Sequence, residues 1–168
     1  MSANIKIKKN DGRIEEYNPA KYQRRTLIAV EGLENCSASE IEMHAAPSII
    51  DGASAADIQI ALIKASANLI SPEKPEYEIA TARLLNQKIR KEVYGQWKPK
   101  PLLEMIKRNC DAGFYDGKYL FDNYSEEDIL RYETYLDYDR DENFVYSGLN
   151  KVEKSYLMRV DGVIIERP

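Results

Sequence analysis

The sequence contains few residues of the kinds that assemble redox, metal or covalent chemistry. Its 168 residues include two cysteines, Cys36 and Cys110, and one histidine, His44. The cysteines lie far apart and have no CxxC partner, which argues against a disulfide framework or a zinc ribbon and favours structural thiols. His44 falls on an expected amphipathic helix without an Asp, Ser or Cys at useful spacing, so a surface or boundary position is favoured over a catalytic one. We expect no metal site and no redox cofactor in this chain.

Long apolar runs and the familiar phosphate-binding sequences are missing as well. The most promising apolar runs are broken by Glu31 or Lys64, so none approaches the roughly 20 residues of a membrane span. Residues 5–9 alternate apolar and basic side chains and do not form the apolar core of a signal peptide. No Walker A loop, GxGxxG turn or kinase signature occurs. We therefore expect a soluble, cytoplasmic protein, in which any nucleotide site is of another kind.

Charge is unevenly distributed and does not predict a broad basic face. The chain holds 24 Lys+Arg against 28 Asp+Glu, which gives a net charge of −4. Residues 1–95 hold 13 of each sign, whereas residues 96–168 hold 11 Lys+Arg against 15 Asp+Glu. This is unlike a general nucleic-acid binder. With 43% hydrophobic residues, the chain is long enough for one or two compact domains with a real core.

The first 95 residues predict a β-hairpin followed by four helices. Strands are expected over 5–9 and 13–17, because Asp11-Gly12 between alternating runs is a good hairpin signal. The helices are expected at about 19–31, from 38 to before 51, from 55 to about 70, and from about 75 to 94. Their N-terminal signals are Asn18-Pro19, a capping box of Ser37 with Glu40, and Ser54 with Asp57.

Residues 96–168 predict more helix and a final hairpin. Helices are expected over 102–109, from Ser125 to about Arg140, and less regularly over 144–156. A hairpin is expected over 160–165, around Asp161-Gly162.

Two features of this second half suggest chemistry but have simpler explanations. The run 126–142 contains eight carboxylates against two arginines, which could form a metal or acid/base site, but its helical spread favours a solvated face. Tyr132, Tyr135 and Tyr138 could suggest radical transfer. Tyrosines at three-residue spacing on one helix face are more often packing residues with a solvated hydroxyl, and we favour that interpretation.

Several lysines near the hairpin and the helix starts could together hold an anion. They are Lys8, Lys9, Lys21, Lys64 and Lys91. A phosphate chain needs several donors and the positive ends of helices to replace its hydration. Taken alone the signal is weak, because lysines on a helical bundle are usually solvated.

A dense set of motifs runs through nearly the whole chain. In residues 1–95 they are Lys9, Asp11-Gly12, Glu15, Asn18, Lys21, Glu31-Gly32-Leu33, Asp51-Gly52, Asp57-Ile58, Ile63-Lys64-Ala65, Leu69-Ile70-Ser71, Pro75, Tyr77, Ala82-Arg83-Leu84, Arg90-Lys91 and Tyr94-Gly95-Gln96. In residues 96–168 they are Gly113, Tyr115-Asp116, Tyr124-Ser125, Glu127, Asp139-Arg140-Asp141, Phe144, Tyr146 and Tyr156-Leu157. With these motifs the sequence resembles the ATP-cone domain at the front of class I ribonucleotide reductase large subunits. The resemblance implies a mainly α fold, in which a hairpin lid covers a four-helix bundle over 1–95 and the helical N-terminal domain of the large subunit begins at 96–168.

The resemblance also implies a site for ATP or dATP, accompanied by Mg²⁺. Lys9 and Lys91 would hold the phosphates with Lys21 nearby, while Glu15 and Asn18 would hydrogen-bond the adenine. Ammonium groups suit a polyphosphate, and a carboxylate suits an exocyclic amine.

Three positions depart from the family pattern at the same pocket. Asn10 replaces a common cation, Gln59 a histidine by the sugar, and Ala55 a hydroxyl residue. A lost charged hydrogen bond removes roughly 1.5–3 kcal/mol, so ATP-type binding is expected to persist, to be weaker or to be vestigial, and tight dATP inhibition is in doubt.

By resemblance, the catalytic cysteines, the substrate site and the specificity-effector site lie in a barrel beyond Pro168, so this chain has no catalytic residue. It would be a truncated or, as we slightly favour, a naturally split large subunit. Its partners would be the catalytic remainder and the radical-bearing small subunit, in a hetero-oligomer without nucleic acid or membrane. One alternative is a structural module with degenerate nucleotide binding. A cone-type transcriptional repressor is disfavoured by the missing CxxC pairs and the neutral first half.

Overall fold

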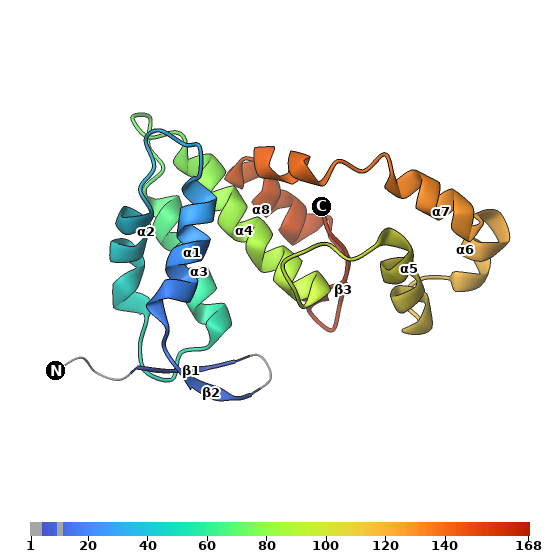
Figure 1. The fold of residues 1–168 in the computed structure, drawn as a ribbon, viewed down its shortest axis with the longest axis horizontal. Helices are drawn as coiled ribbons and strands as arrows, with labels where there is room; N and C mark the ends of the chain where they lie inside the picture. Colours follow the sequence, from blue (N-terminus) through green and yellow to red (C-terminus); the bar gives the residue numbers. More distant parts are fainter. Residues whose placement is uncertain (1–4, 10–11) are drawn as a thin grey trace.

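The first part of the chain is a β-hairpin set against one end of four helices (Figure 1). This computed structural model describes residues 5–9 and 12–168, so Asn10 and Asp11 of the expected turn lie outside the described residues. The elements are β1 (Lys6–Lys8), β2 (Ile14–Glu16), α1 (Pro19–Val30), α2 (Ala38–Ala45), the 3₁₀ turn η1 (Ala46–Ser48), α3 (Ala55–Asn68) and α4 (Tyr77–Tyr94). The predicted hairpin and four helices are confirmed.

The hairpin is fixed to the loop that leads into α3. Its strands pair antiparallel with Ile7 opposite Glu15, and Ile7 is buried in the core. The backbone N–H of Lys8 donates to the carbonyl of Ala53 at 3.0 Å, and the N–H of Gly52 donates to the carbonyl of Lys6 at 2.8 Å. These bonds place the charged face of the hairpin beside the first turn of α3.

The predicted helix starts are confirmed with one exception. The Asn18 side chain accepts from the N–H of Ala20, as an N-cap should. Ser54 and Asp57 form a reciprocal capping box at α3.

The capping box expected at α2 is only half formed. Ser37 accepts from the N–H of Glu40, but the Glu40 carboxylate binds Lys74 at 2.7 Å and accepts from the hydroxyl of Tyr77 at 2.7 Å. The N–H of Ser37 donates to that same hydroxyl at 3.0 Å. A tertiary ion pair and a buried tyrosine thus replace the local bond, and they tie α2 to the start of α4.

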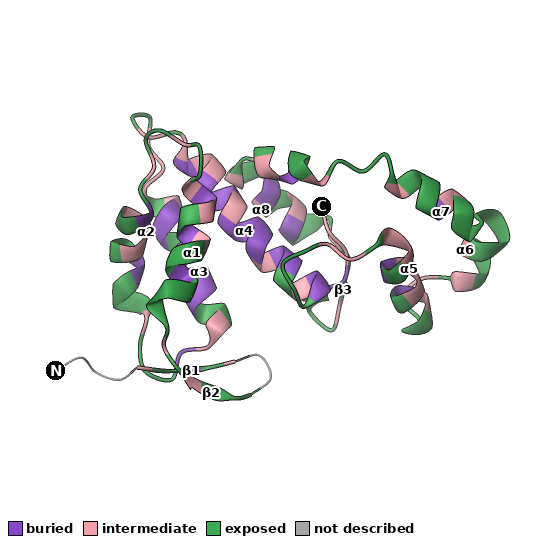
Figure 2. Cartoon of the chain, viewed as in Figure 1, coloured by how far each residue is buried: buried purple, intermediate pink, exposed green. Residues whose placement is uncertain are grey.

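Helix α4 is the central rod of the molecule. It packs against α1 and α3 on one side and against α8 (Tyr146–Ser155) on the other. Figure 2 shows buried residues along most of its length, and Ala80, Thr81, Leu84 and Ile89 are fully buried. Because α4 is covered on two sides, its apolar residues are not confined to a single face, as they are in a helix at the protein surface.

The second part of the chain forms shorter elements. These are α5 (Leu102–Asp111), α6 (Gly117–Asn123), α7 (Glu126–Glu133), the 3₁₀ segment η2 (Tyr138–Asn143), α8, β3 (Arg159–Val160) and β4 (Val163–Ile164). The expected α5, α8 and final hairpin are confirmed. Among the described residues, no helix has the length and apolar character that crossing a bilayer requires.

Two expectations for this part are wrong. The helix from Ser125 ends at Glu133, well short of Arg140, because the Asp137 side chain accepts from the N–H of Asp139 and starts η2. Helix α6 was not predicted, although Asp116 caps it by accepting from the N–H of Tyr119.

We expect core packing on α4 to dominate the stability. The substitution Leu84→Ala should lower the free energy of unfolding by about 2–5 kcal/mol, because it leaves a cavity at a fully buried position. The matched substitution Leu27→Ala, on the exposed face of α1, should change it by less than about 0.5 kcal/mol. Urea unfolding followed by circular dichroism measures both, and equal effects would contradict the assignment of α4 as the core.

Candidate functional site

Three of the expected site residues meet at the hairpin. The Glu15 carboxylate, on β2, lies 2.9 Å from the ammonium of Lys9 and 3.3 Å from that of Lys21 on α1. The hydrogen bond from Lys9 is the main cause that holds the pKa of Glu15 below its usual value, and Lys21 adds to it. The hairpin and α1 thus each contribute one lysine to the same carboxylate.

Asn18 lies at the junction between the hairpin and α1. Its side-chain oxygen is used by the cap on Ala20, so a ligand would meet its amide nitrogen. The preceding Tyr17 stacks on Tyr22, with ring centroids 5.3 Å apart. This aromatic pair gives the strand-to-helix junction an apolar wall beside the charged residues.

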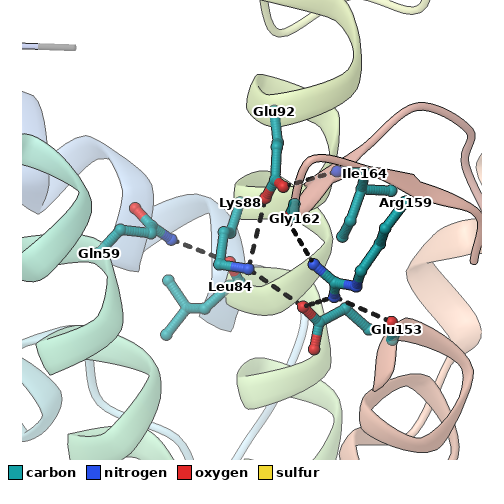
Figure 3. Close-up of polar contacts among 8 residues, drawn as sticks. All are labelled: Gln59, Leu84, Lys88, Glu92, Glu153, Arg159, Gly162 and Ile164. Atoms are coloured by element: carbon teal, nitrogen blue, oxygen red, sulfur yellow. Dashed lines mark hydrogen bonds and ion pairs between the residues drawn. The ribbon is translucent and has the colours of Figure 1, made fainter. Parts of the chain in front are cut away.

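Gln59 is buried on α3 and both ends of its amide are engaged. Its oxygen accepts from the Arg25 guanidinium at 2.6 Å, and its nitrogen donates to the Leu84 carbonyl at 2.9 Å. Figure 3 shows the second of these bonds, from α3 to α4. The predicted pocket residue Gln59 therefore links three helices.

Sequence reasoning missed Arg25 and Gln87, which complete this polar cluster. The Arg25 guanidinium lies 5.1 Å from the centroid of the Tyr22 ring, and burial lowers the pKa of Arg25. The side-chain nitrogen of Gln87 donates to the Arg25 carbonyl at 3.1 Å, while its buried oxygen lacks a partner among the described residues. The available signal for Arg25 was its place one turn after Lys21 on the same face of α1.

The other expected site residues lie apart from this cluster. Lys91 is exposed on the last turn of α4, where its ammonium donates to the Gly95 carbonyl at 2.6 Å. Within 5–9 and 12–168, no hydrogen bond or ion pair joins Lys91 to Lys9 or Glu15. Ala55 is the first residue of α3, beside the hairpin, and Asn10 lies outside the described residues. Lys8 and Lys64 are exposed.

A second polar network lies on the opposite side of α4 (Figure 3). Lys88 binds Glu92 at 3.5 Å and Glu153 of α8 at 3.2 Å, and Arg159 binds the same Glu153 at 2.8 Å. Burial raises the pKa of Glu153, but Arg159 and Lys88 outweigh it, so that pKa lies below its usual value. Glu92 also accepts from the N–H of Ile164, at 2.8 Å. Helix α4 is thus joined to the polar cluster on one side and to α8 and the final hairpin on the other.

The cysteines and the histidine occupy the expected kinds of position. Cys36 and Cys110 are free and half-buried, and burial raises the pKa of the Cys36 thiol to about 11. A thiol with so high a pKa is protonated at neutral pH and is a poor nucleophile. His44 is exposed on α2, as expected.

The acidic run and the tyrosines differ from expectation. The run is not one solvated face, because Asp141 is buried between the guanidinium groups of Arg90 and Arg167. Tyr132 and Tyr135 are not packing residues, since they are 48% and 75% exposed. Tyr138 is half-buried and does pack, with the Arg167 guanidinium 4.3 Å from the centroid of its ring.

The bundle and its hairpin define a small helical domain closed at one end by a charged β-ribbon. The sequence profile of the ATP cone domain matches residues 5–92, and the chain belongs to this family. This match confirms the resemblance drawn from the motifs of the hairpin and the bundle.

The similarity to known proteins extends past the cone. The chain is 37% identical over 168 residues to ribonucleoside-diphosphate reductase 1 subunit alpha of Escherichia coli strain K12, covering 99% of this chain and 22% of that protein. It is 34% identical over 166 residues to the ribonucleoside-diphosphate reductase subunit alpha of Enterobacteria phage T4, covering 98% of this chain and 22% of that protein. The chain thus spans about a fifth of the length of these relatives, and it matches their N-terminal region.

The ion cluster at the hairpin can be tested by titration. The carboxyl of Glu15 should titrate below its usual pKa, and Lys9→Met should raise that pKa more than Lys21→Met, since Lys9 is the larger cause. Because the folded-state pKa is lowered, the stabilisation is present at neutral pH and is lost as the pH falls through that value. Carbon-13 NMR of the carboxyl group measures the pKa, and equal shifts for the two variants would contradict the assigned order.

Proposed function

We propose that this chain is the N-terminal regulatory part of a class I ribonucleotide reductase large subunit and binds ATP or dATP beneath its hairpin. The observation that carries the proposal is the cluster of Lys9, Glu15 and Lys21 in a domain of the ATP-cone family. The complete enzyme would reduce ribonucleoside diphosphates to deoxyribonucleotides. This chain would regulate that reaction without taking part in its chemistry.

The described residues suit the phosphates and the base of a nucleoside triphosphate. Lys9 and Lys21 have side chains that are 33% and 54% exposed, so their ammonium groups are accessible to phosphate oxygens. The start of α3, beside the hairpin, adds the partial positive charge of a helix N-terminus. When a triphosphate binds Lys9, the Glu15 carboxylate is released to accept from the adenine amine, and the Asn18 amide lies nearby.

Lys91 enters this proposal through the ATP-cone resemblance. Its ammonium is held by the Gly95 carbonyl through a short bond on an exposed helix end. A long lysine side chain on the surface reorients at little cost when a stronger, charged acceptor is offered. We therefore assign Lys91 to the phosphates together with Lys9.

The regulatory effect requires that the nucleotide binds one subunit arrangement better than another. Helix α4 is suited to carry this difference, because Gln59 contacts its Leu84 carbonyl and Lys88, one turn later, binds Glu153. We propose that the cone biases how the catalytic remainder of the large subunit associates with the radical-bearing small subunit.

A second function is favoured by the Gln59 cluster. Both polar ends of Gln59 are engaged by Arg25 and Leu84, so a sugar hydroxyl would have to displace an existing bond. Such a pocket suits a structural module of the reductase with degenerate nucleotide binding. The two functions differ in whether ATP binds at all.

Isothermal titration with ATP and dATP in magnesium buffer separates these functions. Binding should be saturable, and Lys9→Met and Lys91→Met should each weaken it by about tenfold to a hundredfold, the usual effect of a lost charged hydrogen bond. The matched control is Lys118→Met, on α6, whose side chain is 87% exposed and pairs with Asp122. This control should leave the affinity unchanged.

Two outcomes would contradict the proposed ATP site. Absence of binding at millimolar nucleotide would favour the structural module. If ATP bound equally well to both lysine variants and to the parent chain, its site would not lie beneath the hairpin.

A further inference from the structure

The side chain of Gln87 carries a buried hydrogen-bond acceptor that has no partner. Gln87 lies on α4 and is 5% exposed, and its side-chain nitrogen donates to the Arg25 carbonyl at 3.1 Å. Its side-chain oxygen is buried and accepts no hydrogen bond within residues 5–9 and 12–168. Such an acceptor is rare in folded proteins and is usually explained by an ordered water or a ligand. The oxygen of Gln87 therefore indicates a place where a molecule with a hydrogen-bond donor binds.

Gln87 belongs to a polar cluster that is built from α1, α3 and α4 (Figure 1). The half-buried Arg25 guanidinium donates to the Gln59 side chain at 2.6 Å, and Gln59 donates in turn to the Leu84 carbonyl (Figure 3). No carboxylate pairs with Arg25 in the part of the chain that the structure describes. Because a guanidinium has five N–H groups, several of them remain for a ligand. The cluster thus offers N–H donors from Arg25 and one acceptor from Gln87.

A hydroxyl group is the ligand chemistry that satisfies this combination. Its O–H can donate to the oxygen of Gln87, while its own oxygen accepts from the guanidinium of Arg25. Ionised phosphate oxygens are acceptors, so they suit Arg25 but leave Gln87 unpaired. An ordered water has the same groups as a hydroxyl, and a hydroxyl of a bound molecule can take its place.

The cluster lies one helical turn from residues of the proposed nucleotide site. On α1, Arg25 follows Lys21 by four residues, and on α4, Gln87 precedes Lys91 by four residues. Residues four apart share one face of a helix. The proposed function assigns these lysines to the phosphate end of the ligand and Glu15 to the adenine. The ribose joins these two parts of ATP and carries hydroxyl groups, so it is the part of the ligand that suits the cluster.

We propose that the oxygen of Gln87 accepts a hydrogen bond from a ribose hydroxyl of the bound nucleotide, and that Arg25 donates to the same hydroxyl. Gln87 is then a specificity-determining residue, which distinguishes a nucleotide that has this hydroxyl from one that lacks it. This inference rests on the proposed function and adds the part of the nucleotide that the site recognises. When the hydroxyl is missing, the Gln87 oxygen stays buried and unpaired in the complex, and binding is weakened.

Isothermal titration of the 168-residue chain with ATP, 2′-deoxy-ATP and 3′-deoxy-ATP tests this assignment. At least one deoxy nucleotide should bind about tenfold or more weakly than ATP, because it leaves a buried acceptor unpaired. The weaker of the two identifies the hydroxyl. The substitution Gln87→Met removes the acceptor and keeps the length of the side chain, so it should abolish the difference between ATP and that analogue.

Asn86 provides a matched control on the same helix. It is 2% exposed, and both polar atoms of its amide are buried without a partner in the described chain. It lies on a different face of α4, between Arg83 and Arg90, which both pair with carboxylates of η2. The substitution Asn86→Leu should therefore leave the preference for ATP unchanged.

The outcomes separate this inference from the proposed function. Equal affinity of the parent chain for all three nucleotides overturns the inference alone, and assigns an ordered water to Gln87. A preference that persists in Gln87→Met, or that is lost in Asn86→Leu, overturns it as well. Absence of any binding overturns the proposed function together with the inference. Thermal unfolding followed by circular dichroism checks that both variants fold, and the comparison of nucleotides on the parent chain needs no variant.

Discussion

The burial of helix α4 between the bundle and α8 is the constraint on which the arrangement of the molecule depends. On one side α4 packs against α3, where Gln59 donates to the Leu84 carbonyl, and on the other side Lys88 of α4 binds Glu153 of α8. Leu84 and Lys88 are one helical turn apart, so the two networks share a rigid element. The hairpin end and the second half of the chain are therefore mechanically joined, as the proposed regulation requires.

Most of the fold could be predicted from the sequence because its signals are local. The bundle helices carry apolar residues at helical spacing, and Asn18 and Ser54 mark their starts with side chains that cap the backbone. Predictions were wrong where another contact competes with the expected one. Glu40 leaves its capping box for the tertiary contacts with Lys74 and Tyr77, and the helix predicted from Ser125 ends early because Asp137 caps the start of η2.

The candidate site could be predicted only in part. Lys9, Glu15 and Lys21 were assigned through family resemblance, and the structure brings them together. The cluster around Gln59 could not be read from sequence, because Arg25, Gln87 and the Leu84 carbonyl reach it from two other helices and no spacing rule connects them. The exposure of Tyr135 was likewise missed, since it depends on where α7 ends.

The proposed function requires that a nucleotide binds between the hairpin and the bundle. The most direct measurement is a titration of the isotope-labelled 168-residue chain with magnesium ATP, followed by the NMR shifts of its backbone amides. The account predicts saturable shifts centred on Lys9, Glu15 and the first turn of α3, with smaller shifts along α4 and α8. Unchanged spectra at millimolar ATP, or shifts confined to residues outside the hairpin and bundle, would contradict it.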